Sequence, residues 1–269
     1  EYCSKECECN PVYLDLKIIK PPLLNASGVF FVSAVCNVLS ISFYLIKSIK
    51  MDKNSTIMIK PLIIACDGEA ASGKSTGAKI ISKKYKLLLI NSGLLYRYAS
   101  KIIIENKPKK IIPFLKKEFK KTTYNKISNQ KLFSQQISEN VGYLSKKKAV
   151  RDIINKIQRD LIKNNSRICV EGRDIASNIL KKNPMYDVAF YFTCNINTAS
   201  KRRWLELKKK VSLIEVKKSL KLRTLLDKSR TNNPLKKVKD AILIKSDKLS
   251  KLDVIKKMSY EIEKRLKLK

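Results

Sequence analysis

The stretch Pro61–Thr76, PLIIACDGEAASGKST, decides the fold. Leu62 to Ala65 is a short apolar run typical of a buried strand, and the letters GEAASGKS at 68–75 match GxxxxGK[ST] at every fixed position. Residues 76–85 then show the apolar spacing of a helix. A strand, a glycine loop and a helix in this order predict a phosphate-binding loop, and the alternative is a chance strand-to-helix turn that ends in Lys-Ser.

The residue types in this loop suit a nucleoside triphosphate. Gly68 and Gly73 let the backbone turn inward so that its N–H groups surround a phosphate chain, and the helix N-terminus adds about half a positive charge there. We expect Lys74 to reach the β- and γ-phosphates and the Ser75 hydroxyl to bind Mg²⁺. The predicted triphosphate-binding residues are Gly68, Glu69, Ala70, Ala71, Ser72, Gly73, Lys74, Ser75 and Thr76.

The formal net charge of +35 is extreme for 269 residues. The Lys side chains are spread along the chain without interleaved aromatic residues, so a solvated coat explains them better than a nucleic-acid surface does. Arg offers phosphate a planar fork that Lys cannot copy. The ten Arg among the 58 basic residues are therefore the more informative cations. The chain has no His, which excludes imidazole catalysis.

Residues 1–50 differ in character from the remainder. An uncharged run of eighteen residues, Val29 to Ile46, is barely long enough to span a bilayer, which needs about 20 apolar residues. We interpret residues 1–50 as a non-core extension, either read-through sequence or a weak transmembrane segment, and residues 58–269 as the working domain. A true membrane anchor is the alternative.

Strand and helix signals alternate from Lys60 onward. Apolar runs predict five strands, at 62–65, 87–90, 168–171, 188–192 and 241–244. Helical patterns occupy 76–85, 139–164, 197–210, a stretch after Ser212 and a stretch after Ser250 with Leu252, Ile255, Ile262 and Leu266 as its apolar side. The Lys-rich segment 102–131 is only loosely periodic and looks like a small insertion. This alternation predicts an α/β, three-layer fold around a five-stranded parallel sheet.

Several arginines follow the predicted strands, and ligands of open α/β sheets bind at the carboxyl ends of the strands. Ser92, Tyr96 and Arg97 follow the second strand, Arg173 and Asp174 follow the third, and Arg223, Asp227 and Arg230 lie on a later helical stretch. With Arg151, five arginines are placed to meet near the loop. They predict a second, phosphate-bearing substrate, although Arg173 and Asp174 could also form a plain ion pair in a turn.

The order of six segments resembles the bacterial cytidylate kinases, which are nucleoside monophosphate kinases. The resemblance covers about Lys60 to Leu266 and rests on ACDGEAASGKST, NSGLLYR, RDIINKIQRD, EGRDIAS, RRWLEL and the pair LRTLLDKSRTNNPL and DAILIKSD. It implies a P-loop kinase fold with a small acceptor-binding insertion and a helical lid.

The resemblance also implies roles for single residues. It assigns Lys74, Arg173 and Arg230 to catalysis, and the loop 68–76 to ATP. The implied CMP-binding residues are Ser92, Tyr96, Arg97, Arg151, Arg173, Asp174, Arg223, Asp227 and Arg230. Among these, Arg151 and Asp174 would read the cytosine edge, whose amino donor and ring acceptors suit a carboxylate and a guanidinium. Arg202 and Arg203 would belong to the lid, unless they are ordinary exposed helix charges, and Glu171 would orient Mg²⁺ through water.

The sequence departs from the family pattern at four points, one of which is Glu171, where the family has Asp. Glu69 stands where the family has Pro, and Gly142 stands where it has a Ser that contacts the base. Ser138 or Ser145 could replace that hydroxyl. The segment between Arg97 and Gly142 is also shorter than usual, so we expect a reduced insertion.

Taken together, the sequence predicts a cytoplasmic, monomeric enzyme that converts ATP and CMP (or dCMP) into ADP and CDP (or dCDP) with Mg²⁺. The acceptor is itself an ionised phosphate, so no general base is needed and the absence of His is no obstacle. We expect no specific nucleic-acid partner and no membrane association. The alternatives are a UMP, AMP or small-alcohol acceptor, and a nucleic-acid-stimulated ATPase.

Overall fold

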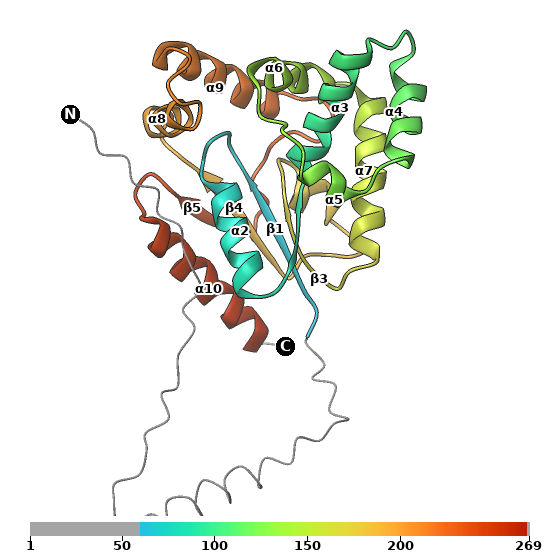
Figure 1. Cartoon of the computed structure of the whole chain (residues 1–269). Helices are drawn as coiled ribbons and strands as arrows, with labels where there is room; N and C mark the ends of the chain where they lie inside the picture. Colours follow the sequence, from blue (N-terminus) through green and yellow to red (C-terminus); the bar gives the residue numbers. More distant parts are fainter. Residues whose placement is uncertain (1–59, 268–269) are drawn as a thin grey trace, which may run out of the picture. The chain divides into compact units, whose positions relative to one another are not determined.

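The structure is a computed structural model that describes residues 60–267. The predicted extension at residues 1–50 lies outside this part of the chain. Five strands form one parallel sheet, as predicted, and their order in the sheet is β2-β3-β1-β4-β5 (Figure 1). Their bounds are β1 Leu62–Gly68, β2 Leu88–Asn91, β3 Arg167–Glu171, β4 Val188–Thr193 and β5 Ile242–Lys245.

Helices surround this sheet. Their bounds are α2 Lys74–Lys84, α3 Ser92–Asn106, α4 Ile111–Lys120, α5 Tyr124–Ser128, α6 Gln135–Leu144, α7 Lys148–Lys163, the π-helix η1 Ile175–Ile179, α8 Ile196–Glu206, α9 Leu213–Lys228 and α10 Lys251–Lys267. None of the helices between residues 60 and 267 has both the length and the apolar composition of a bilayer span.

Both faces of the sheet are buried, which explains why its strands read as continuous apolar runs. All seven residues of β1 are buried, and successive side chains point to opposite faces. Leu62, Ile64 and Cys66 pack with α2 and α10, whereas Ile63 and Ala65 pack with η1 and the end of α7. Figure 1 shows α2 and α10 together on one side of the sheet. The predicted three-layer architecture is confirmed.

A second core lies in the insertion beside the sheet. Helices α3 to α7 share one apolar cluster whose fully buried members include Leu95, Leu115, Leu132 and Ile154. The segment 102–131, which looked loosely periodic, contains the end of α3 and all of α4 and α5. Its regular structure was not visible in the sequence because α4 and α5 have only 10 and 5 residues, too few for the apolar spacing to repeat.

The prediction of one continuous helix over 139–164 is wrong. The chain forms α6 and α7, and a turn at 145–147 separates them. Leu144 and Val150 are both buried in the same cluster, but in a continuous helix they would lie about 120° apart, at the limits of one apolar face of about 100°. The break helps to bury both. The break follows Ser145, whose hydroxyl donates to the Gly142 carbonyl oxygen at 3.1 Å and so competes with the backbone.

The predicted capping box at the start of α9 is confirmed. The Ser212 hydroxyl accepts from the Glu215 N–H at 3.2 Å, and the Ser212 N–H donates to the Glu215 carboxylate at 3.1 Å. The apolar side predicted for α10 is partly wrong, because Leu252 is 59% exposed. Ile262 is buried as predicted, Ile255 and Leu266 pack against the same core, and Val254 and Met258 are buried in addition.

The phosphate-binding loop begins where β1 presses against β4. A Cβ atom on Gly68 would lie 2.4 Å from the Phe192 carbonyl oxygen, and the residue has φ +153°. The Glu69 N–H donates to that same oxygen at 3.1 Å, so the two strands cannot separate to make room. By contrast, a Cβ atom on Gly142 in α6 would meet nothing within 4 Å.

We therefore expect Gly68→Ala to destabilise the fold by about 3 kcal/mol or more, because overpacking adds to backbone strain. Gly142→Ala is the matched control and should stabilise it by about 0.5–1 kcal/mol through helix propensity. Urea unfolding of the three proteins measures both effects. Equal stability of Gly68→Ala and wild type would contradict the close approach.

Candidate active site

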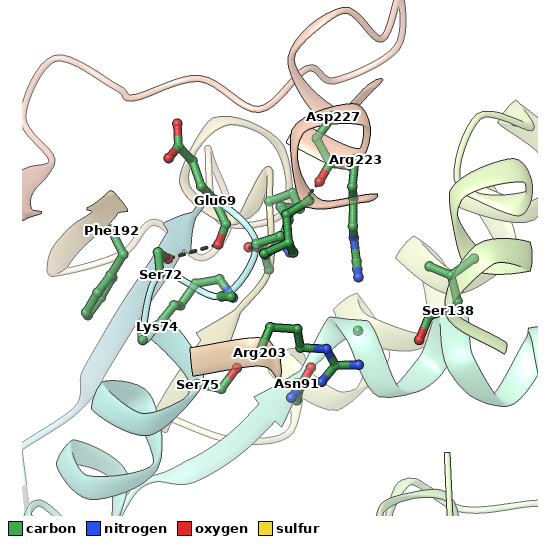
Figure 2. Close-up of a pocket in the computed structure, with 18 of the residues that line it drawn as sticks. Glu69, Ser72, Lys74, Ser75, Asn91, Ser138, Phe192, Arg203, Arg223 and Asp227 are labelled. Atoms are coloured by element: carbon green, nitrogen blue, oxygen red, sulfur yellow. Dashed lines mark hydrogen bonds and ion pairs between the residues drawn. The ribbon is translucent and has the colours of Figure 1, made fainter. Parts of the chain in front are cut away.

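A cavity of about 990 Å³ opens at the carboxyl ends of the strands. This volume lies at the upper end of the range for small-molecule sites. Its walls come from the phosphate-binding loop, the start of α3, the residues after β3, and helices α6, α8 and α9. Figure 2 shows Lys74 and Ser75 from the loop on one side, with Arg223 reaching in from α9 and Arg203 extending from α8.

The loop leaves the N-terminus of α2 open toward this cavity. Gly73 is the N-cap residue, adopts a left-handed conformation with φ 80°, and provides no side-chain cap. The first N–H groups of α2 are therefore not capped by a side chain, which is the arrangement that favours an anion. Ser75 and Thr76 are exposed, and all of residues 69–77 line the cavity. The Ser72 hydroxyl donates to the Glu69 carbonyl oxygen at 2.9 Å and fixes the bend.

Lys74 is buried beside a carboxylate. Its Nζ lies 3.4 Å from Glu171 Oε2, and both side chains are buried. Burial lowers the pKa of Lys74, as does the nearby Arg173 charge, while the Glu171 and Asp67 carboxylates oppose this change. Glu171 comes from the end of β3, which pairs with β1 at this level. The pairing of β3 with β1 therefore places the Glu171 carboxylate beside Lys74.

Asp67 connects the loop to the chain that follows β3. Its two carboxylate oxygens accept the N–H groups of Ile175 and Ala176, each at 2.8 Å. These N–H groups open η1, directly after Arg173 and Asp174. Burial raises the pKa of Asp67 to about 6, although the two backbone hydrogen bonds oppose the rise. The sequence analysis did not identify Asp67, because its partners are more than one hundred residues away.

Seven of the ten arginines line the cavity, including all that were predicted. They are Arg97, Arg151, Arg173, Arg202, Arg203, Arg223 and Arg230. Burial and the charges of Arg173, Arg97 and Arg203 together lower the pKa of Arg223 to about 9, although the Asp227 carboxylate opposes the change. Burial lowers the pKa of Arg97 to about 10, with Arg203 and Arg173 contributing. These cations destabilise one another in the absence of an anion.

Carboxylates offset only part of this charge. Asp174 pairs with Arg151. Asp227 accepts from Arg173 Nε at 2.9 Å and lies 3.8 Å from Arg230. Arg151 Nε and Arg230 Nη2 are buried and have no hydrogen-bond partner within residues 60–267. Buried donors without partners are rare in native proteins, so these two atoms are candidates to donate to a ligand.

Other predicted side chains have different surroundings from those expected. Arg202 does not extend freely: it donates to Ser246 Oγ at 3.0 Å and to the Ser246 carbonyl oxygen at 2.9 Å, next to Gly73. Arg203 pairs with Glu206 at 3.0 Å. Both lie on α8 and line the cavity, but nothing in this arrangement tests the predicted lid movement.

The first two turns of α3 supply Ser92, Tyr96 and Arg97 to the same cavity. The Ser92 hydroxyl bonds to Gln158 of α7, a buried residue that the sequence analysis missed. The available signal was its place directly before Arg159, because these two residues form the QR pair of the segment RDIINKIQRD, which resembles the family. Burial raises the pKa of the Tyr96 hydroxyl well above its ordinary value, so it stays neutral.

Among the departures from the family pattern, Gly142 lines the cavity together with Ser138 and Ser145. Ser138 accepts from Arg97 Nη1 at 2.9 Å, and Ser145 donates to the Gly142 carbonyl oxygen. Glu69 pairs with Lys228 of α9 at 2.7 Å. Neither Lys228 nor this contact between the loop and α9 was predicted.

Comparison with known proteins agrees with this geometry. The sequence profile of the family described as cytidylate kinase matches residues 64–264. A cytidylate kinase of Fusobacterium nucleatum is 36% identical over 217 residues, which cover 76% of this chain and 98% of the relative. A cytidylate kinase of Thermosipho melanesiensis is 34% identical over 220 residues, covering 77% and 100%. A bifunctional pantoate ligase/cytidylate kinase of Prochlorococcus marinus is 31% identical over 231 residues, covering 78% of this chain and 44% of that protein.

The buried Asp67 carboxylate gives a pH-dependent prediction. Its pKa of about 6 is above the ordinary 3.8, so the folded state binds the proton more tightly than the unfolded state does. The resulting stabilisation is fully present below about pH 4 and is lost as the pH rises through 6. Asp67→Asn stays neutral but loses one acceptor for the N–H groups of η1.

We therefore expect the free energy of unfolding of Asp67→Asn, relative to wild type, to increase by up to about 3 kcal/mol between pH 4 and pH 7. Urea unfolding at pH 4.5, 6 and 7.5 measures the difference. A constant offset at all three values would show that the carboxylate does not titrate with a raised pKa.

Proposed function

Because the chain belongs to the cytidylate kinase family, we propose that it transfers the γ-phosphoryl group of ATP to CMP or dCMP. The products are ADP and CDP or dCDP. The observation that supports this most is the set of incompletely neutralised guanidinium groups facing an uncapped helix N-terminus across one cavity. One anion site suits a triphosphate donor, and the second suits a monophosphate acceptor.

The phosphate-binding loop forms the donor half. Residues 68–76 surround the triphosphate with backbone N–H groups, and Lys74 contacts its β- and γ-phosphates. The buried Lys74–Glu171 ion pair keeps the ammonium group at the base of the loop before the nucleotide binds. Arg202, fixed on Ser246 beside Gly73, lies at the edge of this half.

The residues present fit Mg²⁺ in the way that kinases use it. Mg²⁺ is typically held by substrate phosphates, waters and one or two protein oxygens. The exposed Ser75 hydroxyl lines the cavity, and Glu171 supplies a carboxylate next to Lys74. Within residues 60–267 no three metal-binding side chains cluster together. A magnesium site in which the substrate phosphates supply most of the ligands is therefore the kind that fits these residues. When bound, the ion offsets the charge of the phosphate oxygens.

The acceptor half comes from the arginines. Arg97, Arg173 and Arg230 hold the CMP phosphate, Asp227 and Arg223 lie near the ribose, and Arg151 with Asp174 meets the cytosine edge. In this arrangement the free Arg151 Nε and Arg230 Nη2 gain ligand partners. Ser92 and Tyr96 line the base side, and the open space at Gly142 leaves room beside it.

Positioning and charge stabilisation then account for the reaction. An oxygen of the acceptor phosphate bonds to the γ-phosphorus, and the bond from that phosphorus to the β–γ bridging oxygen breaks. Lys74, Arg173 and Arg230 stabilise the negative charge on the transferring group. Arg203 of α8 approaches the transferring group as α8 and α9 close and exclude water. The enzyme is proposed to act as a cytoplasmic monomer.

A coupled assay over CMP, dCMP, UMP and AMP tests this function. We expect CMP and dCMP to give the highest kcat/KM, because a carboxylate and a guanidinium match the cytosine edge. A preference for AMP, or turnover that needs DNA or RNA and phosphorylates no nucleotide, would refute the proposal.

Arg173→Lys tests the acceptor half separately. Lys keeps the charge but loses the planar fork that bonds Asp227 and a phosphate together. We expect the KM for CMP to rise about tenfold, with the KM for ATP within about twofold of wild type, since a charged hydrogen bond contributes about 1.5–3 kcal/mol. Arg159→Lys, at an exposed position of α7, is the control and should change neither constant. Equal losses for both substrates in Arg173→Lys would place it outside the acceptor half.

A further inference from the structure

Arg97 is held differently from most arginines of the cavity. Arg151, Arg173, Arg203 and Arg230 each have a carboxylate oxygen within 4.0 Å. Arg97 forms no ion pair with any residue in 60–267 that the structure records. Its Nη1 instead donates to the Leu132 carbonyl oxygen at 3.1 Å and to Ser138 Oγ at 2.9 Å.

The third partner of Arg97 is the ring of Phe133. The guanidinium carbon lies 4.6 Å from the ring centroid, within the range of a cation–π contact. All three partners come from one short stretch, 132–138, which is anchored by the fully buried Leu132. Phe133 itself is 59% exposed and lines the cavity. Its ring therefore contributes little to the core.

The uncharged partners of Arg97 have a specific electrostatic effect. A carboxylate would orient Arg97 but would also cancel its charge, and so weaken its attraction for a phosphate. A carbonyl, a hydroxyl and an aromatic face orient the guanidinium and leave its full positive charge available. Arg97 is 7% exposed, so this charge lies in a partly desolvated setting where it acts strongly on a ligand.

From this geometry, and resting on the proposed CMP kinase function, we infer that Phe133 is a positioning residue of the acceptor site. Its ring keeps the Arg97 guanidinium directed at the acceptor phosphate without neutralising it. Phe133 acts through Arg97 and touches neither the base nor the donor.

Three variants of the full chain test this role. Phe133→Leu keeps an apolar side chain but removes the π face, whereas Phe133→Tyr keeps the face. Tyr143→Leu is the matched control. Tyr143 is 57% exposed, and Lys147 Nζ lies 4.4 Å from its ring centroid, so this ring also makes a cation–π contact. Tyr143 does not line the cavity. Steady-state kinetics with CMP, UMP and ATP varied in turn, and thermal unfolding, are measured for each.

We expect Phe133→Leu to raise the KM for CMP about two- to fivefold, the size of an exposed cation–π contact. The same factor should apply to UMP, because the acceptor phosphate is shared. The kcat, the KM for ATP and the unfolding temperature should stay near wild type, and Phe133→Tyr and Tyr143→Leu should match wild type throughout.

Three results would overturn the inference. The first is an unchanged KM for CMP in Phe133→Leu, and the second is an increase in this KM in Phe133→Tyr as large as that in Phe133→Leu. The third is an increase in KM that differs between CMP and UMP, because this would mean that the ring stacks on the base. If the wild-type chain phosphorylates no nucleoside monophosphate, the proposed function fails instead. The two failures are therefore distinguishable.

Discussion

Repulsion among cations is the constraint on which the site depends. Seven guanidinium groups and Lys74 border one cavity, and several of them lower one another's pKa values. The fold tolerates this because Glu171, Asp174 and Asp227 lie among them at short range. Full neutralisation would make the free protein more stable but would remove the attraction for two phosphate-bearing substrates. The arrangement keeps an intermediate balance, with some cations paired to carboxylates and others, such as Arg97, held by neutral groups.

The two halves of the site are also joined mechanically. The loop is tied to β4 through Gly68 and Phe192, and to η1 through Asp67. Lys228 of α9 pairs with Glu69 in the loop, and its neighbour Asp227 holds Arg173 and Arg230. The exposed Glu69–Lys228 pair is weak on its own. It nevertheless gives α9, which supplies much of the acceptor half, a direct contact with the donor loop.

The sequence was sufficient for features that depend on neighbouring residues. The glycine loop, the five apolar strands and the Ser212 capping box are local patterns, and the structure shows each of them. The sequence was insufficient where residues far apart in the chain determine the local structure. The break at 145–147 helps to bury Leu144 and Val150 in one core, and the position of Asp67 depends on N–H groups 108 and 109 residues away. For the same reason Arg97 and Arg173 were predictable from strand ends and the other cavity arginines from helical stretches and the family resemblance, but their partners were not. Phe133 carries no motif that would have identified it, whereas the QR pair that Gln158 forms with Arg159 was a signal that the sequence analysis did not use.

The location of the arginines has a consequence for how this gene can change. The chain contains 58 basic residues, of which ten are Arg and the remaining forty-eight are Lys. Such a ratio points to a coding sequence drawn toward A-rich Lys codons, under which any Arg that Lys could replace tends to be lost. Yet seven of the ten survive around a single cavity, while two of the other three, Arg159 and Arg265, are exposed on helices. With such a bias, the arginines kept around the cavity mark positions where the shape of the cation matters as well as its charge.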